Sequence, residues 1–168
     1  AGLVYRILST AATGIPLEAQ VRENRFKLLF LDIGLLHTGY KVDIQQIWDH
    51  DILQVHSGRL AEQFVGQELL AYADFYENEQ LYFWKREKKS SSAEIDYVAN
   101  FHGRVIPIEV KSGGTGRLKS LQTFMEEKKV KIGLKISQSL PSLENNILSV
   151  PLYMIEQIPR LLRECFTR

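Results

Sequence analysis

Two stretches of alternating residues, joined by a short turn, constrain the fold of this 168-residue chain more than any other feature. Residues 93–99 and 104–111 alternate apolar and polar side chains, and Phe101-His102-Gly103 supplies the turn between them. Alternation with a period of two is typical of a β-strand that buries one face. Two such strands joined by so short a turn are expected to pair in antiparallel fashion. The sequence therefore predicts a hairpin at this point, within a larger sheet.

The segments after residue 56 predict helices on both sides of this hairpin. Helices are expected from Ser57 to about Tyr76, from Leu118 to about Lys129 and over residues 158–166, because apolar residues recur there with helical spacing. Further strands are expected at 80–86, 131–137 and 150–155. From residue 57 the predicted order is thus α-β-β-β-α-β. This order predicts an α/β fold of mixed α+β character, in which helices flank a mixed sheet.

The first third of the chain predicts a separate hairpin with short helices behind it. Residues 3–8 and 25–32 are apolar and β-prone, and a turn cluster lies between them. Asp32 is expected to cap a short helix over 33–37, and a further helix with a loop is expected over 43–55.

The alternating strands bring together side chains that can carry chemistry. Glu109 and Lys111 fall on one face of their strand, and Asp96 on the neighbouring strand can approach Glu109 near the strand ends. Two converging carboxylates repel each other unless a cation lies between them, and an oxygen-only site favours Mg²⁺ or Mn²⁺. A lysine two residues after a metal-binding carboxylate can orient or help deprotonate a bound water. These groups suffice for phosphodiester hydrolysis.

The same alternation makes predictions about the neighbours of Asp96. Ile95 and Tyr97 are expected to share the opposite face of their strand. Glu94 is expected on the Asp96 face, where it either supports the site or is simply an exposed charge, and the second interpretation is favoured. Tyr82 and Trp84 alternate on the preceding strand, and we expect them to pack in the core rather than to stack on bases.

Charge and composition bear on partners and location. Residues 85–140 carry 12 Lys+Arg against 6 Asp+Glu, which suits a polyanion such as nucleic acid, although chance asymmetry of a solvated surface explains the charge equally well. The chain contains no apolar run long enough to cross a membrane and no secretory signal at its start. Its single cysteine, Cys165, suits a reducing compartment. A cytoplasmic protein without a membrane partner is therefore expected.

Taken together, the helix residue Glu62, the strand residue Asp96 and the triplet Glu109-Val110-Lys111 resemble the signature of the PD-(D/E)XK nuclease-like superfamily. The resemblance extends further, because six blocks in order are similar to the C-terminal region of a large family of prokaryotic AAA+ ATPases. In that family an ATPase module is followed by a winged-helix segment and by a domain of unknown function with this nuclease-like core. The blocks are residues 1–6, 27–36, 58–65, 82–85, 93–98 and 106–113.

The resemblance implies a restriction-endonuclease-like fold, a domain division and a set of roles. Residues 1–50 would be the tail of a winged-helix-like segment, and residues 51–168 would be the nuclease-like domain. Asp96, Glu109 and the Val110 carbonyl would hold the metal ion, Lys111 would position the water, and Glu62 would support the site from its helix. The chain contains no GxxxxGK[ST] stretch, so no ATP site is expected in it.

Three functions stay open at this point. The first is a Mg²⁺-dependent nuclease domain that acts on DNA or RNA. The second is a non-catalytic module that uses the same fold to bind nucleic acid or a protein partner for the ATPase module of the same polypeptide, because fold alone does not dictate function. The third is an oligomerisation element of the ATPase.

Overall fold

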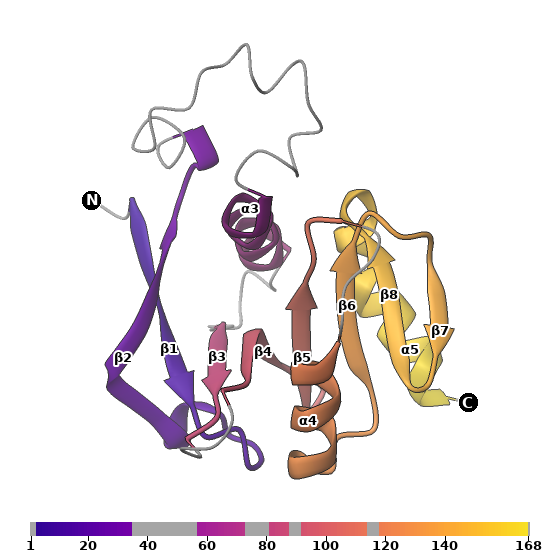
Figure 1. Cartoon of the computed structure of the whole chain (residues 1–168), viewed down its shortest axis with the longest axis horizontal. Helices are drawn as coiled ribbons and strands as arrows, with labels where there is room; N and C mark the ends of the chain where they lie inside the picture. Colours follow the sequence, from indigo (N-terminus) through magenta and orange to yellow (C-terminus); the bar gives the residue numbers. More distant parts are fainter. Residues whose placement is uncertain (1–2, 35–56, 73–80, 88–91, 114–117, 168) are drawn as a thin grey trace.

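An eight-stranded mixed sheet organises the chain, with strand order β2-β1-β3-β4-β5-β6-β8-β7 (Figure 1). The computed structural model describes residues 3–34, 57–72, 81–87, 92–113 and 118–167. The strands are β1 (Val4–Thr10), β2 (Val21–Phe30), β3 (Tyr82–Lys85), β4 (Glu94–Phe101), β5 (Arg104–Val110), β6 (Gly133–Ser137), β7 (Ser142–Glu144) and β8 (Ile147–Pro151). The helices are α3 (Ser57–Ala71), α4 (Lys119–Lys128) and α5 (Ile158–Thr167), with short 3-10 helices η1 (Glu18–Gln20) and η2 (Leu152–Gln157).

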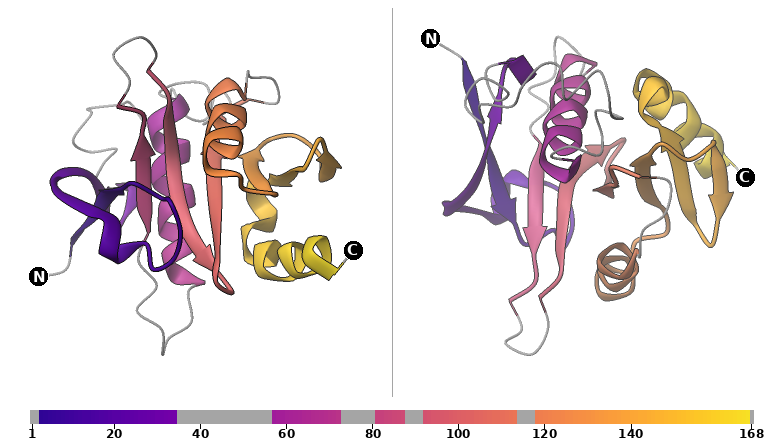
Figure 2. Two further views of the ribbon diagram at one scale, coloured as in Figure 1. Left: turned by 90° about the horizontal axis from the view of Figure 1, so that it is seen from below. Right: turned by 45° about the horizontal axis from the view of Figure 1, so that its top comes forward.

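Apolar side chains are buried on both faces of this sheet. One core cluster joins Val65 of α3 and Leu162 of α5 to strand residues such as Ile108. The other joins Leu121 and Phe124 of α4 to a second set of strand residues. Helices α3 and α5 therefore cover one face and α4 covers the other, as the two views in Figure 2 show for α4 and α5. This three-layer arrangement lets each amphipathic helix bury its apolar stripe.

The predicted order of elements is confirmed. Helix α3 is followed by β3, β4, β5, α4 and β6, which is the expected α-β-β-β-α-β series, and the sheet is mixed and flanked by helices. Tyr82 and Trp84 are both 4% exposed and lie in the core, as expected. One strand prediction was wrong: the end of the chain has a β7–β8 hairpin, and residues 152–157 form η2 rather than the end of a strand. Asn145 and Asn146, both with positive φ, make the turn of that hairpin.

The central β4–β5 hairpin is antiparallel and closes with a two-residue turn. Phe101 pairs with Arg104, and both His102 (φ 47°) and Gly103 (φ 74°) adopt positive φ. Two positive φ values are the mark of a type I′ turn, whose twist matches that of the flanking strands. Further along the hairpin Tyr97 pairs with Ile108, and beyond this pair the backbone N–H of Val110 on β5 donates a hydrogen bond to the Asp96 side chain on β4.

A bulge in β4 changes the direction of its side chains at Asp96. Tyr82 of β3 pairs with Val98, but Trp84 pairs with Ile95, so that Asp96 and Tyr97 together lie opposite Phe83. Ile95 consequently packs in the α4 cluster, whereas Tyr97 packs in the α3 cluster. The prediction that Ile95 and Tyr97 share one face was therefore wrong, because the extra residue interrupts the alternation.

The expected N-terminal hairpin exists and forms part of the same sheet. Strands β1 and β2 pair in antiparallel fashion, and β1 also pairs in parallel with β3 through Leu8–Tyr82 and Ser9–Phe83. The assignment of residues 1–50 to a winged-helix-like segment stays a prediction. The helices expected over 33–37 and 43–55 lie almost wholly outside the described residues, as does the expected end of α3 near Tyr76. In the described part of the chain, every helix is too short or too polar to cross a membrane.

Candidate functional site

The Asp96 carboxylate is fixed at the bulge of β4. Its Oδ2 accepts a hydrogen bond of 2.8 Å from the backbone N–H of Val110 on β5. Its side chain is 21% exposed. Burial, followed by repulsion from the carboxylates of Glu109 and Glu62, raises the pKa of Asp96 to about 7, against the lowering effects of the Val110 N–H and of Lys27. Asp96 therefore lies within electrostatic reach of both other predicted carboxylates.

The Glu109 side chain is less exposed than that of Asp96, and only one of its two carboxylate oxygens has a hydrogen-bond partner among the described residues. Its Oε1 accepts a hydrogen bond of 2.6 Å from Lys111 Nζ, while Oε2 is buried without a hydrogen-bond partner among the described residues. Burial raises the pKa of Glu109, although Lys111 acts in the opposite direction. A buried carboxylate oxygen that lacks a donor is costly unless a cation or water completes its coordination.

Glu62 reaches the site from α3, which is held close to β4. The Tyr97 hydroxyl donates a 2.8 Å hydrogen bond to the backbone carbonyl of Glu62. Gly66 lies one turn further along α3, where a Cβ would clash with the Tyr97 hydroxyl and would come within 2.7 Å of Leu29 Cδ1. The absence of a side chain at Gly66 thus allows the helix to approach the sheet closely. This approach carries the Glu62 carboxylate to the carboxylates of β4 and β5.

Lys27 is a member of the site that was not predicted from the sequence. Its ammonium group lies 2.9 Å from Glu62 Oε1, 2.8 Å from Glu94 Oε1 and 3.9 Å from Asp96 Oδ1. Burial acts to lower the pKa of Lys27, but Glu62, Glu94 and Asp96 outweigh it, and the pKa is raised. The available signal was the β2 pattern, in which Lys27 lies two residues before the buried Leu29 and so shares its inward face.

Glu94 is part of this ion-pair network and not simply an exposed charge. It contacts Lys27 and also lies 3.3 Å from the ammonium of Lys85. Its burial acts to raise its pKa, but hydrogen bonds and charge from the two lysines prevail, so that the pKa of Glu94 is lowered. The favoured interpretation of Glu94 was therefore wrong, because it did not anticipate a lysine from the N-terminal hairpin.

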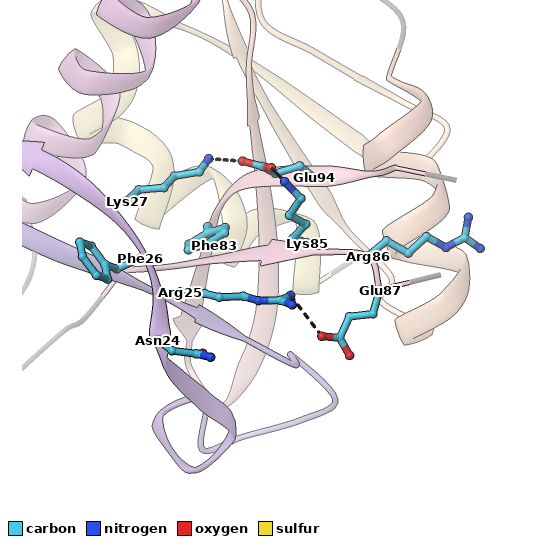
Figure 3. A pocket seen from close by; sticks show the side chains of 9 residues that line it. All are labelled: Asn24, Arg25, Phe26, Lys27, Phe83, Lys85, Arg86, Glu87 and Glu94. Atoms are coloured by element: carbon cyan, nitrogen blue, oxygen red, sulfur yellow. Dashed lines mark hydrogen bonds and ion pairs between the residues drawn. The ribbon is translucent and has the colours of Figure 1, made fainter. Parts of the chain in front are cut away.

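A groove of about 870 Å³ opens beside Lys27 and Glu94, between β2 and the β3–β4 pair (Figure 3). Its lining residues are mostly charged or polar: Asn24, Arg25, Phe26, Lys27, Phe83, Lys85, Arg86, Glu87 and Glu94. Four cations and two carboxylates line it, and Arg25 is paired with Glu87 at 3.2 Å. The groove thus carries a net positive charge directly next to the carboxylates.

The four predicted site residues, Glu62, Asp96, Glu109 and Lys111, lie near one another in the structure. Their side chains can therefore be compared with the needs of a metal ion. No three His, Cys, Asp or Glu side chains of the described residues are arranged so that they could hold a metal ion by themselves. The predicted set has two carboxylates and one backbone carbonyl, and Mg²⁺ commonly completes its coordination with water and substrate oxygens. Glu109 Oε2, which has no hydrogen-bond partner in the described part of the chain, and the raised pKa of Asp96 are both features that a cation would relieve. The donor set fits Mg²⁺ or Mn²⁺, and the metal roles of Asp96, Glu109 and Val110 stay predictions.

The fold and the site together define a mixed α/β domain with a carboxylate–lysine cluster at the point where α3, β4 and β5 meet. The chain belongs to the family described as Domain of unknown function (DUF4143), whose model matches residues 57–154. Glu62, Asp96, Glu109 and Lys111 all lie within the matched segment, whereas Lys27 lies before it.

Comparison with solved structures gives one weak likeness. It is to a chain in a structure described as a refined half-complex from a tetradecameric assembly of Thermococcus gammatolerans McrB AAA+ hexamers with bound McrC. The TM-score is 0.44 at 14% identity, and the match covers 63% of the present chain and 33% of that chain. A TM-score of this size does not establish a common fold. No curated protein matches the chain.

Proposed function

We propose that this chain is the C-terminal nuclease-like domain of an AAA+ ATPase and that it hydrolyses phosphodiester bonds of nucleic acid with Mg²⁺ or Mn²⁺. The observation that carries the proposal is the convergence of Asp96 and Glu109 from paired strands, with one buried oxygen of Glu109 left without a partner among the described residues. Lys111 contacts that same carboxylate at 2.6 Å. This arrangement of two carboxylates and a lysine fits the resemblance to PD-(D/E)XK nucleases.

In the proposed reaction each residue has a distinct task. Asp96 and Glu109, with the Val110 carbonyl, would hold the metal ion, which when bound polarises the phosphate and stabilises charge on the attacking and leaving oxygens. Lys111 would orient the attacking water, because its ammonium is already fixed against Glu109. Glu62 would support the site from its position on α3. The water oxygen then bonds to phosphorus and gives up one proton as one P–O ester bond breaks, and the leaving oxygen takes up a proton, so that the two protons balance.

The adjoining groove supports nucleic acid as the substrate class. Arg25, Lys27, Lys85 and Arg86 line it, and these cations can neutralise successive phosphates along a strand. Glu87 and Glu94 already form ion pairs with cations of the groove. When nucleic acid binds, its phosphates therefore have to replace these carboxylates as partners of the cations. Binding is accordingly expected to weaken steeply as the salt concentration rises.

Cleavage assays on supercoiled plasmid, single-stranded DNA and RNA in Mg²⁺ or Mn²⁺ test the proposal directly. Asp96→Ala and Lys111→Ala should abolish cleavage, whereas Lys131→Ala, which removes an exposed lysine before β6, should leave it unchanged. Circular dichroism establishes that each variant is folded. Equal cleavage by the Asp96 and Lys111 variants would assign the activity to a contaminant and reject the enzyme.

A non-catalytic binding module is the second candidate. The observation that favours it is the Lys27 ammonium, which lies 2.9 Å from Glu62 Oε1 and 2.8 Å from Glu94 Oε1 and so balances part of the acidic charge at the site. Fluorescence anisotropy with a labelled oligonucleotide in EDTA separates the two functions. Binding that persists in EDTA, together with no cleavage in Mn²⁺, would favour the module.

The association with an AAA+ ATPase rests on the six-block sequence resemblance. It predicts that the complete gene encodes a GxxxxGK[ST] phosphate-binding loop upstream of Ala1. Sequencing the complete reading frame tests this part. A complete frame without that loop would reject it.

A further inference from the structure

The Lys27 ammonium lies among three carboxylates. It contacts carboxylate oxygens from two different elements, Glu62 on α3 and both Glu94 and Asp96 on β4. The Lys27 side chain is 24% exposed, and its Nζ also lies 5.1 Å from the centre of the Phe83 ring. A lysine on an outer strand of a sheet is normally free to extend into water. Here the side chain instead points inward and joins three acidic side chains.

The contacts distinguish the carboxylate oxygens that already accept a short hydrogen bond from those that do not. Asp96 Oδ2 is engaged by the Val110 N–H, whereas Asp96 Oδ1 faces Lys27 at 3.9 Å. Glu109 Oε1 is engaged by Lys111 at 2.6 Å, whereas Oε2 has no partner among the described residues. Two lysines thus flank the carboxylate pair, Lys27 beside Asp96 and Lys111 beside Glu109. The longest of the three Lys27 contacts is the one to Asp96.

We propose that Lys27 is the resident counter-ion of this site, and that a divalent cation reaches Asp96 and Glu109 only by displacing the Lys27 ammonium from Asp96. The proposal rests on the metal site of the proposed function but not on cleavage. On displacement, Lys27 keeps its shorter contacts with Glu62 and Glu94, which hold it at the edge of the groove. The N-terminal hairpin thereby sets the affinity of the site for metal ions.

A charge so close to the carboxylate pair should have a large effect on divalent affinity, because like charges a few ångströms apart repel strongly in a partly buried site. Lys85 provides a matched control. Its ammonium also lies close to Glu94, at 3.3 Å. Among the ion pairs of the described residues, Lys85 has none with Glu62 or Asp96. The two lysines carry the same charge, so a difference between the effects of the two substitutions on metal affinity reflects the positions of the lysines.

The experiment measures binding of Mn²⁺ alone by electron paramagnetic resonance of the free ion, with the full 168-residue chain. Lys27→Gln should tighten Mn²⁺ binding by about tenfold or more, while Lys85→Gln should change it by less than about threefold and Lys27→Arg should resemble the wild type. Unchanged or weaker binding by folded Lys27→Gln would overturn the proposal, as would equal effects of the Lys27 and Lys85 variants. Failure of every variant to bind Mn²⁺ would overturn it as well.

A measurement on the wild type covers the case in which Lys27→Gln does not fold. Nitrogen-detected NMR follows the lysine ammonium groups during a Mg²⁺ titration, and the Lys27 signal should move while that of Lys131 stays in place. A stationary Lys27 signal at saturating Mg²⁺ would reject displacement. Cleavage is measured separately, so a chain that binds Mn²⁺ as expected but does not cut nucleic acid rejects the proposed activity and leaves the role of Lys27 standing.

Discussion

The hydroxyl of Tyr97 on β4 donates a 2.8 Å hydrogen bond to the backbone carbonyl of Glu62 on α3. This contact joins the strand that carries Asp96 to the helix that carries Glu62. It exists because the β4 bulge turns Tyr97 toward α3 while Ile95 packs against α4. The bulge therefore determines both where a site carboxylate lies and how the helix above it is held.

Removal of this hydroxyl should cost stability and loosen the site. Tyr97→Phe is expected to lower the free energy of unfolding by about 1 kcal/mol, the usual net contribution of one buried hydrogen bond. Urea denaturation measures the loss. Tyr153→Phe is the matched control, since Tyr153 is 76% exposed and the substitution there should be neutral. Equal effects at the two positions would show that the Tyr97 hydrogen bond does not hold α3.

The raised pKa of Asp96 makes the metal-free protein less stable at high pH. The folded state has a pKa of about 7 for a group whose ordinary value is 3.8, so between these values the folded chain binds more protons than the unfolded chain. Stability contributed by protonated Asp96 is present below about pH 4 and is lost as the pH rises through 7. Asp96→Asn should remove this dependence and stabilise the protein at pH 8, by at most about 4 kcal/mol.

Urea denaturation of both proteins in EDTA at pH 5 and pH 8 tests this prediction. The wild type should lose stability relative to Asp96→Asn between these two values. An unchanged difference between the two proteins would mean that Asp96 is ionised normally when folded. Saturating Mg²⁺ should reduce the difference, because a bound cation favours the ionised carboxylate.

Glu109 should determine whether a divalent cation stabilises the fold. Mg²⁺ at about 100 times its dissociation constant should stabilise the wild type by about 2.7 kcal/mol, because it binds only the folded chain. Glu109→Gln removes the charge from the buried oxygen that has no partner among the described residues, and it should abolish this increase. Thermal melts with and without Mg²⁺ measure the effect, and Glu126→Gln, an exposed acid on α4, serves as the control. An undiminished Mg²⁺ effect in Glu109→Gln would exclude Glu109 as a ligand.

Two glycines of α3 should respond differently to the same substitution. Gly66→Ala forces a methyl group against Tyr97 and Leu29 and should destabilise the protein by about 1–3 kcal/mol. Gly58→Ala meets no atom within 4 Å and should be neutral or stabilising by up to about 1 kcal/mol, because alanine favours the helix. Chemical denaturation compares them. Similar values for both would mean that α3 can move away from the sheet at little cost.

The parts of the fold that follow local rules could be predicted from the sequence. Alternation and the His102-Gly103 turn specify the β4–β5 hairpin, which brings Asp96 on β4 close to Glu109 on β5. The bulge could not be foreseen, because it arises from the pairing of β4 with β3 and not from the sequence of β4 alone. Lys27 was missed for a similar reason. Its role depends on the parallel pairing of β1 with β3, a contact between segments more than 70 residues apart.

The parallel pairing of β1 with β3 also determines what can be removed from this chain. The segment matched by the family model, residues 57–154, would lack β1, β2 and α5 if it were expressed alone. Strand β3 would then present unpaired backbone groups along an open edge, and the apolar surface under α5 would face water. Open edges of this kind recruit other strands and lead to aggregation. The boundaries of the matched segment and of the folding unit therefore differ, and an insoluble fragment would reveal nothing about the chemistry of its carboxylates.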